Sequence, residues 1–241
     1  MNNASDFEIK NKIKFIEKND IQKKFDSRYK EDYFDTRNSD DPKRVTSFKS
    51  EASYIKQYVS KGKLLDVGCS TGEFLDYVEW DGDRFGVEIS DFAAKKAFER
   101  GVSVSNVIPT DMDEMFDLVI FRGTIQHVDT PFYDLQKVYK LLKKGGYLVF
   151  LATPNANSPF YKIWNTLPAL NPELNFFIPS DIVLKNSLKN IGFQFVSARY
   201  PYFTSPYSNV IRDHIYFVAR LFGIKKNFPF HRSMMELMFK K

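Results

Sequence analysis

A run of small residues between two apolar segments is the first feature of this sequence that indicates a ligand-binding site. Residues 64–67 form an apolar run that contains Asp66, residues 68–72 read Gly-Cys-Ser-Thr-Gly, and an amphipathic segment starts at Glu73. This order predicts a strand, a tight turn and a helix. Glycines let the backbone approach a ligand closely, and the first turn of a helix offers free N–H groups. We therefore expect a nucleotide-like or carboxylate-bearing ligand here, although many α/β proteins need such a turn only to reverse the chain.

A carboxylate and an imidazole follow two other predicted strands. Glu88 lies at the end of the strand predicted at 84–89, and His127 follows the strand predicted at 116–121. In a doubly wound sheet, ligands bind at the carboxyl ends of the strands. A free imidazole, with an ordinary pKa of about 6.5, accepts a proton at neutral pH. His127 is thus the best candidate for a general base, and the structural alternative is that it caps the next helix.

The elements that must position these residues alternate along the chain. Helices are predicted at 42–59, from Glu73, and at 91–100, 131–142 and 181–191. Strands are predicted at 64–67, 84–89, 102–108, 116–121, 147–152, 193–199 and 233–240. Strands that alternate with helices at this spacing predict an α/β fold with a doubly wound, mainly parallel seven-stranded sheet.

The chain is expected to divide into three regions that differ in composition. Residues 1–45 form an N-terminal helical extension or lid, residues 46–155 form the ligand-binding core, and residues 156–241 complete the sheet. In this last region, the Pro-, Asn- and aromatic-rich stretch 157–179 is too long for a simple connection and should cover the site. An aromatic and basic insert at 205–231 contains Ile211, Ile215, Val218 and Phe222 on one predicted helical face.

Composition narrows the class of protein. The chain of 241 residues is long enough to bury a core, and its 43% hydrophobic content includes 24 Phe and 13 Tyr. Cys69 is its single cysteine, so a disulfide framework and a thiolate metal cluster are excluded, and no His, Cys, Asp or Glu spacing suggests a metal site. The N-terminus lacks an apolar signal region and no run is long enough to span a bilayer, which favours a cytoplasmic protein.

The net charge of +5 is unevenly distributed. Residues 1–60 carry 13 basic and 11 acidic groups, residues 61–155 carry 11 and 15, and residues 156–241 carry 11 and 4. The excess of positive charge in the last third favours an anionic partner there, and solvated surface lysines explain part of it.

Four motifs in order resemble the class I S-adenosylmethionine (SAM) dependent methyltransferases. They are LLDVGCSTG at 64–72, GVE at 86–88, FDLV at 116–119 with QHV at 126–128, and LLKKGGY at 141–147. The resemblance covers residues 45–155 strongly and 180–241 weakly. It implies a Rossmann-like fold, SAM as the cofactor and methyl transfer as the reaction.

The resemblance also implies roles for particular residues. The glycine turn would hold the methionine part of SAM, Asp66 would orient its amino group, and Glu88 would accept hydrogen bonds from the ribose hydroxyls. Ser70 stands where the family has a glycine, so it needs an unusual backbone angle. Arg44 lies where related enzymes place a lid on the SAM carboxylate, and Asn106 or backbone groups would contact the adenine. The expected cofactor-binding residues are Asp66, Gly68, Cys69, Ser70, Gly72, Glu88, Ile89, Asn106, Phe121, Arg122, Gly123 and Arg44.

Other functions remain as alternatives. A nicotinamide dehydrogenase would need glycine in place of Glu73, because its GxGxxG turn packs the helix closely. The basic, aromatic C-terminal third is compatible with a nucleic-acid methyltransferase, but residues 121–124 read Phe-Arg-Gly-Thr and lack the Asn-Pro-Pro-aromatic signature. Cysteine-based cytosine methylation is excluded, because Cys69 lies in the turn. A non-enzymatic binding protein on this scaffold is the last alternative.

Within the methyltransferases, the sequence most resembles enzymes for small molecules such as sugars, often in surface-polysaccharide or antibiotic pathways. The expected acceptor is a hydroxyl, for which an anionic nucleotide sugar or lipid-linked sugar is one candidate carrier, and an amine is the alternative. His127 would act as the base. Candidate substrate contacts are Tyr161, Trp164, Tyr202 and Arg212. A helix that contacts a membrane surface is a rival explanation for the cations around Ile211, and the oligomeric state is not predicted.

Overall fold

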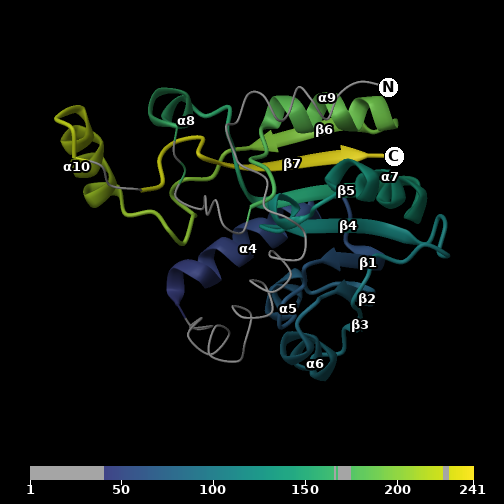
Figure 1. The fold of residues 1–241 in the computed structure, drawn as a ribbon. Coiled ribbons are helices and arrows are strands. Elements are labelled where there is room, and N and C mark those ends of the chain that lie inside the picture. The colour runs from purple at the N-terminus through teal and green to yellow at the C-terminus, as the bar shows by residue number, and fades with distance from the viewer. Residues whose placement is uncertain (1–40, 166, 168–174, 225–227) are drawn as a thin grey trace.

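The computed structural model describes residues 41–165, 167, 175–224 and 228–241. The lid expected within residues 1–45 lies almost entirely outside these ranges, and a boundary at residue 45 would fall inside the first described helix. The sheet has seven strands in the spatial order β3-β2-β1-β4-β5-β7-β6, which runs from bottom to top in Figure 1. These strands are β1 (Lys61–Val67), β2 (Asp81–Val87), β3 (Ser103–Ser105), β4 (Phe116–Arg122), β5 (Leu142–Pro154), β6 (Gln194–Arg199) and β7 (Met234–Lys240).

The direction of the strands places the ligand site. β1 pairs in parallel with both β2 and β4, and β5 pairs in parallel with β4. Only β7 runs against its neighbours, β5 and β6, so the sheet is mainly parallel, as predicted. The strand order reverses between β1 and β4, and ligands of doubly wound sheets bind outside the carboxyl ends of strands at such a switch point. Gly68 and Gly123 follow β1 and β4 at this point.

Helices cover both faces of the sheet, because alternate residues along each strand point to opposite sides. On one face, Leu64, Leu118 and Val149 pack with α4 (Pro42–Lys56), α5 (Glu73–Val78) and α6 (Asp91–Glu99). On the other face, strand residues including Val119 and Phe150 pack with α7 (Pro131–Leu141) and α9 (Asp181–Ile191). The result is the three-layer arrangement expected of an α/β protein.

Several elements differ from the sequence-based expectation, and β1 and β2 each begin three residues earlier than predicted, at Lys61 and Asp81. β5 starts at Leu142 instead of residue 147, because Leu142 pairs with Phe116 before a register shift. β3 is only three residues long. The site-covering stretch contains a short helix, α8 (Pro159–Trp164), which begins at the capping residue Ser158.

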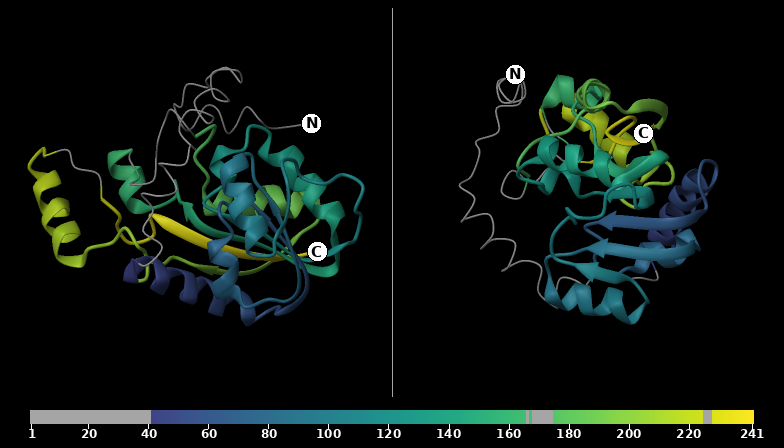
Figure 2. Two further views of the ribbon diagram at one scale, coloured as in Figure 1. Left: turned by 90° about the horizontal axis from the view of Figure 1, so that it is seen from below. Right: turned by 90° about the vertical axis from the view of Figure 1, so that its right-hand side faces the viewer.

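The helix predicted within the aromatic insert forms as α10 (Val210–Leu221). It belongs to the connection between β6 and β7, and the carboxyl end of β6 lies at the same sheet edge as those of β4 and β5. Figure 1 and the left panel of Figure 2 both show α10 standing apart from the sheet at one end of the molecule.

Candidate functional site

The turn after β1 has the backbone conformation that its composition predicts. Gly68 and Gly72 have φ angles of 80° and 75°, in the left-handed region that favours glycine. A Cβ atom on Gly68 would lie 2.4 Å from the Thr124 side-chain oxygen, so β1 and the segment after β4 approach closely here. Ser70 has a φ of 53°, and the unusual angle expected of this residue is therefore present.

Glu88 ties the turn to the end of β2. One of its carboxylate oxygens accepts a hydrogen bond from the Ser70 N–H at 2.9 Å, and the other accepts one from the Ser90 N–H at 2.9 Å. These bonds hold Ser70 in its left-handed conformation and fix the carboxylate at the carboxyl edge of the sheet. A carboxylate oxygen has two acceptor sites, so an oxygen that accepts one backbone N–H can also accept a ligand hydroxyl.

Asp66 presents a buried carboxylate at the same turn. Its side chain is 2% exposed, and its Oδ1 atom has no hydrogen-bond partner among the described residues. Burial raises the pKa of Asp66 to about 7, and the positive charge of Arg122 works against this shift. Because an unpaired buried polar atom is costly, a cationic ligand group such as the amino group of SAM would complete this site.

A second group of charged residues lies where α4 faces α5 and the end of β4. Arg44 donates to Glu73 at 3.1 Å, and the Arg44 Nε and Glu73 Oε1 atoms lack hydrogen-bond partners within the described part of the chain. Arg122 donates to Glu51 at 2.6 Å and lies over the Phe48 ring. The expected cofactor residues Arg44 and Arg122 are thus brought to one side of the turn.

Glu51 was missed by the sequence analysis. It is 2% exposed and accepts hydrogen bonds from Arg122 and from the Ser47 hydroxyl. A signal was present in the sequence, because Glu51 lies beside Ala52 and one turn from Phe48 on the apolar face of the predicted helix. A carboxylate on such a face indicates a buried ion pair.

The other expected cofactor residues fall into two groups. Cys69 and Phe121 have buried side chains in the two cores: burial raises the pKa of the Cys69 thiol, and the Phe121 ring stacks on Phe150 at 5.6 Å. They therefore offer the ligand only backbone groups. Ile89 and Asn106 are exposed next to Glu88 and after β3, respectively. The carbonyl of Gly123 accepts a hydrogen bond from Gln126.

His127 lies in the short 3-10 helix η1 (Ile125–His127), which follows β4 at the carboxyl edge. The Gln126 amide nitrogen lies 2.9 Å from the Gly123 carbonyl and 3.3 Å from His127 Nε2. A carbonyl accepts only, so the atom facing Gly123 is the amide nitrogen. The second hydrogen of this amide nitrogen is available to His127, so Nε2 can accept it in the tautomer that leaves this ring nitrogen without a proton.

Two buried amides near His127 have unused hydrogen-bonding groups. Gln126 Oε1 and both side-chain polar atoms of Asn175 have no partner in the described structure, and both residues are 4% exposed. The Phe176 N–H donates to the Gln126 carbonyl at 2.9 Å, which brings the Asn175 segment against η1. Sequence reasoning missed Asn175, because an isolated asparagine in a Pro- and Asn-rich stretch carries no signal.

The four expected substrate residues lie in or near two helices: Tyr161 and Trp164 belong to α8, Arg212 belongs to α10, and Tyr202 precedes α10. Trp164 contacts Phe160 and Phe217, with ring centroids 5.0 and 5.2 Å apart. Tyr161 is 7% exposed, and Tyr202 and Arg212 both donate hydrogen bonds to the buried Asp213. The described contacts do not connect these four residues with His127, so their substrate role stays a prediction.

Within the described ranges, no group of three or more His, Cys, Asp and Glu side chains could hold a metal ion. The charged and polar groups at the carboxyl edge instead suit an organic ligand with a cationic end near Asp66 and hydroxyl groups near Glu88. No helix in the same ranges is both long and apolar enough to cross a bilayer.

Asp66 gives a pH-dependent test of this arrangement. The unfolded chain releases the Asp66 proton near pH 4, whereas the folded chain holds it to about pH 7. Stability therefore falls as pH rises between these values, because the native state binds more protons there. Relative to Asp66→Asn, the wild-type protein should lose on the order of a few kcal/mol of unfolding free energy between pH 5 and pH 8. Urea unfolding at both pH values measures this difference.

The exposed Asp83 provides the matched control, since Asp83→Asn should leave the pH dependence unchanged. If Asp66 binds the amino group of SAM, a second result is expected. Asp66→Asn should weaken S-adenosylhomocysteine binding at pH 8, because a neutral amide lacks the charge that attracts an ammonium group. Unchanged affinity would mean that Asp66 does not hold the amino group.

Comparisons with known proteins agree on one family and fold. A family model described as a methyltransferase domain matches residues 37–198. Relatives include an uncharacterized protein of Methanocaldococcus jannaschii, 25% identical over 63% of this chain and 74% of that protein. Another is malonyl-[acyl-carrier protein] O-methyltransferase 1 of Ilyobacter polytropus, 25% identical over 71% of this chain and 65% of that protein.

The fold is also found in a crystal structure from Thermotoga maritima. That protein is described as a SAM-dependent methyltransferase and possible histamine N-methyltransferase, and the match has a TM-score of 0.61 and 23% identity. It covers 92% of this chain and 98% of the other. Among the curated relatives, the match spans less than half of the length of several, including tRNA U34 carboxymethyltransferases at 44%.

Proposed function

Because the chain belongs to the class I SAM-dependent methyltransferases, we propose that it methylates a hydroxyl group of a small, anionic acceptor. A sugar or nucleotide-linked sugar is the acceptor class that we favour. SAM, when bound, supplies an electrophilic methyl group on a sulfonium centre. Methyl transfer then needs an aligned nucleophile and, for a hydroxyl, a base that takes its proton.

The cofactor end of the site is assigned to residues around the switch point. Asp66 would hold the amino group, Arg44 the carboxylate and Glu88 the ribose hydroxyls. The unpartnered atoms of Asp66, Arg44 and Glu73 among the described residues support this assignment, because each lacks the contact that a zwitterionic ligand end would provide. The close approach of Gly68 to Thr124 leaves the turn no room for larger side chains.

One observation supports the acceptor end of the site. The side-chain oxygen of Gln126, the neighbour of His127, and both polar side-chain atoms of Asn175 are buried without a partner among the described residues. Amide donors and acceptors match the hydroxyl groups of a sugar, and binding would satisfy atoms that are otherwise costly to bury. His127 Nε2 carries the lone pair that would accept the proton. An acceptor hydroxyl would replace the Gln126 amide as its partner.

The proposal that the acceptor is anionic rests on the positive charge of the last third of the chain. Residues after 155 carry 11 basic and 4 acidic groups, and arginines there could pair with a phosphate or carboxylate. The malonyl-[acyl-carrier protein] relative is named as an O-methyltransferase, which supports oxygen as the methylated atom, whereas the Thermotoga maritima protein is described as a possible N-methyltransferase, so an amine acceptor stays the alternative. The single, buried Cys69 is compatible with a reducing cytoplasm.

A panel of acceptors assayed with labelled SAM tests the proposal. Nucleotide sugars, phosphorylated sugars, free sugars, small amines and RNA are offered to the full chain, with S-adenosylhomocysteine titration as the check on cofactor binding. We expect labelled product from the anionic sugars, at least tenfold above the free sugars, because an ion pair contributes about 1.5–3 kcal/mol. Preferential labelling of amines would change the reaction to N-methylation, and labelling of RNA alone would overturn the small-molecule assignment.

A further inference from the structure

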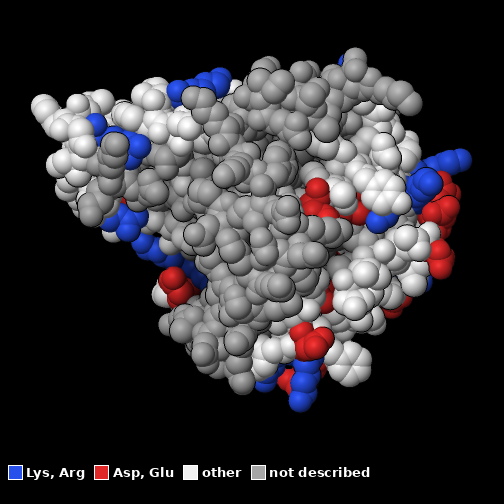
Figure 3. Space-filling model, in the orientation of Figure 1, with Lys and Arg blue, Asp and Glu red and all other residues white. Residues whose placement is uncertain are grey.

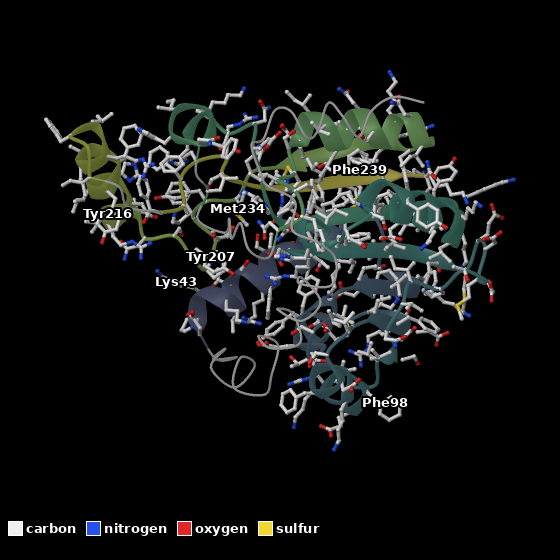
Figure 4. The ribbon with its side chains drawn as sticks, viewed as in Figure 1. Lys43, Phe98, Tyr207, Tyr216, Met234 and Phe239 are labelled. Carbon is white, nitrogen blue, oxygen red and sulfur yellow. The ribbon has the colours of Figure 1, made fainter. Side chains whose placement is uncertain are left out.

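α10 presents an apolar face that no described part of the chain covers. Ile211 and Phe222 are 77% and 81% exposed, and Ile215 and Val218 are more than half exposed. Their spacing places all four on one side of the helix. Figure 4 shows α10, marked by Tyr216, at the end of the molecule opposite Phe98. An exposed apolar group of this size on one helix indicates an interaction surface.

The opposite side of α10 is firmly packed. The Phe217 ring stacks on Phe230 with centroids 4.8 Å apart and meets Trp164 edge-on at 5.2 Å. Asp213 is fully buried and accepts hydrogen bonds from Tyr202 and Arg212. The helix is therefore held in place with its outer face exposed, and the apolar residues there do not serve the internal packing of the insert.

The charges around this face are positive. Asp213 is the only acidic residue of α10 and is buried, so the exposed surface of the helix carries no negative charge. Arg212 is 43% exposed, and the exposed Lys43 donates to the Ser208 carbonyl just before the helix. In the sequence, Lys225 and Lys226 follow. Figure 3 shows blue Lys and Arg atoms beside the white outer edge of α10.

We infer that α10 is a membrane-surface helix that docks this protein on an anionic lipid bilayer. An amphipathic helix with an apolar outer face and flanking cations lies in the interface, with its apolar side chains among the acyl chains and its cations at anionic headgroups. The carboxyl ends of β4, β5 and β6 share the sheet edge from which α10 extends. Docking would thus bring the acceptor end of the site toward the membrane.

A second copy of the chain fits this face less well. A symmetric dimer through α10 would bring together two copies of the same positively charged surface, and like charges oppose such contact. A stable interface also buries about 800 Å² on each partner. A single 12-residue helix that stands apart from the sheet offers few neighbours with which to reach that area.

Vesicle co-sedimentation with the full chain tests the inference. Vesicles of phosphatidylcholine alone are compared with vesicles containing 30% phosphatidylglycerol, at low and at 0.5 M salt. We expect binding to the anionic vesicles, with roughly a fivefold loss of affinity for each cation whose attraction is screened by salt. The double substitution Ile215→Ser and Phe222→Ser should reduce partitioning by about tenfold or more, since two apolar side chains no longer enter the bilayer.

Phe98→Ser is the matched control. Phe98 is 70% exposed on α6, at the opposite end of the molecule, so its substitution should leave vesicle binding unchanged. S-adenosylhomocysteine titration of every variant shows that it is folded and keeps this test independent of turnover. Absence of vesicle binding, or equal loss in the Phe98 variant, overturns the inference. A wild-type dimer that the double substitution dissociates, without vesicle binding, would assign the face to a second copy.

Discussion

His127→Ala should reduce kcat by about 10²–10⁴-fold, the usual contribution of a positioned general base. The expected loss follows from the place of His127 after β4, at the carboxyl edge of the sheet, with Nε2 facing the Gln126 amide nitrogen at 3.3 Å. S-adenosylhomocysteine affinity should change little, because the cofactor contacts that we assign lie on β1, β2 and α4. The measurement is steady-state kinetics with the acceptor that the panel identifies.

The pH profile separates a base from a residue that only positions the substrate. Wild-type kcat/KM should rise through an acidic limb as the imidazole loses its proton, and the His127→Ala variant should lose that limb. His214→Ala is the control, since His214 is exposed on α10 and its Nδ1 atom contacts the Val210 carbonyl. A His127→Ala variant with the wild-type rate and limb would remove this residue from catalysis. If the acceptor is an amine, which needs no base, His127→Ala would also change the rate little. The acceptor panel would already have identified such an acceptor.

Gly68→Ala should both destabilise the protein and impair cofactor binding. The φ angle of 80° costs an alanine about 1–2 kcal/mol, and the new Cβ would lie 2.4 Å from the Thr124 side-chain oxygen. Overpacking of this kind costs a further 1–3 kcal/mol, roughly. At about 2–4 °C per kcal/mol, the melting temperature should fall by about 5–15 °C. Because the same turn faces the ligand, S-adenosylhomocysteine affinity should fall by about tenfold or more.

Gly223→Ala distinguishes the two causes. Gly223 has a φ of 89°, but no heavy atom of the described residues lies within 4 Å of the position that its Cβ would take, neighbours in the chain aside. Gly223→Ala should therefore show the cost of the backbone angle without the clash in thermal unfolding, and it should leave S-adenosylhomocysteine affinity unchanged. Equal destabilisation of the two variants would mean that Thr124 moves aside easily and that the close approach of β1 to β4 does not require glycine.

The order of the elements and the expected place of the ligand could be predicted from the amino-acid sequence. The alternation of strands and helices, the glycine turn at residues 68–72 and Glu88 after β2 are local patterns, and local patterns depend on neighbouring residues that can be read directly. The mainly parallel sheet follows from that alternation. The helix at residues 210–221 was likewise predicted from its spacing, together with the shared face of Ile211 and Phe222.

The packing of distant segments, by contrast, sets which polar groups of the described residues are paired and which are buried without a partner. Arg122 meets Glu51 across 71 residues, and Asn175 is brought against Gln126 by chain folding. Such contacts depend on how distant segments pack, and no local pattern encodes them. The same holds for Tyr202 and Arg212, whose bonds to Asp213 use groups that had been expected to contact the substrate. Which side of α10 faces outward is also a tertiary fact, because both of its sides carry large apolar residues.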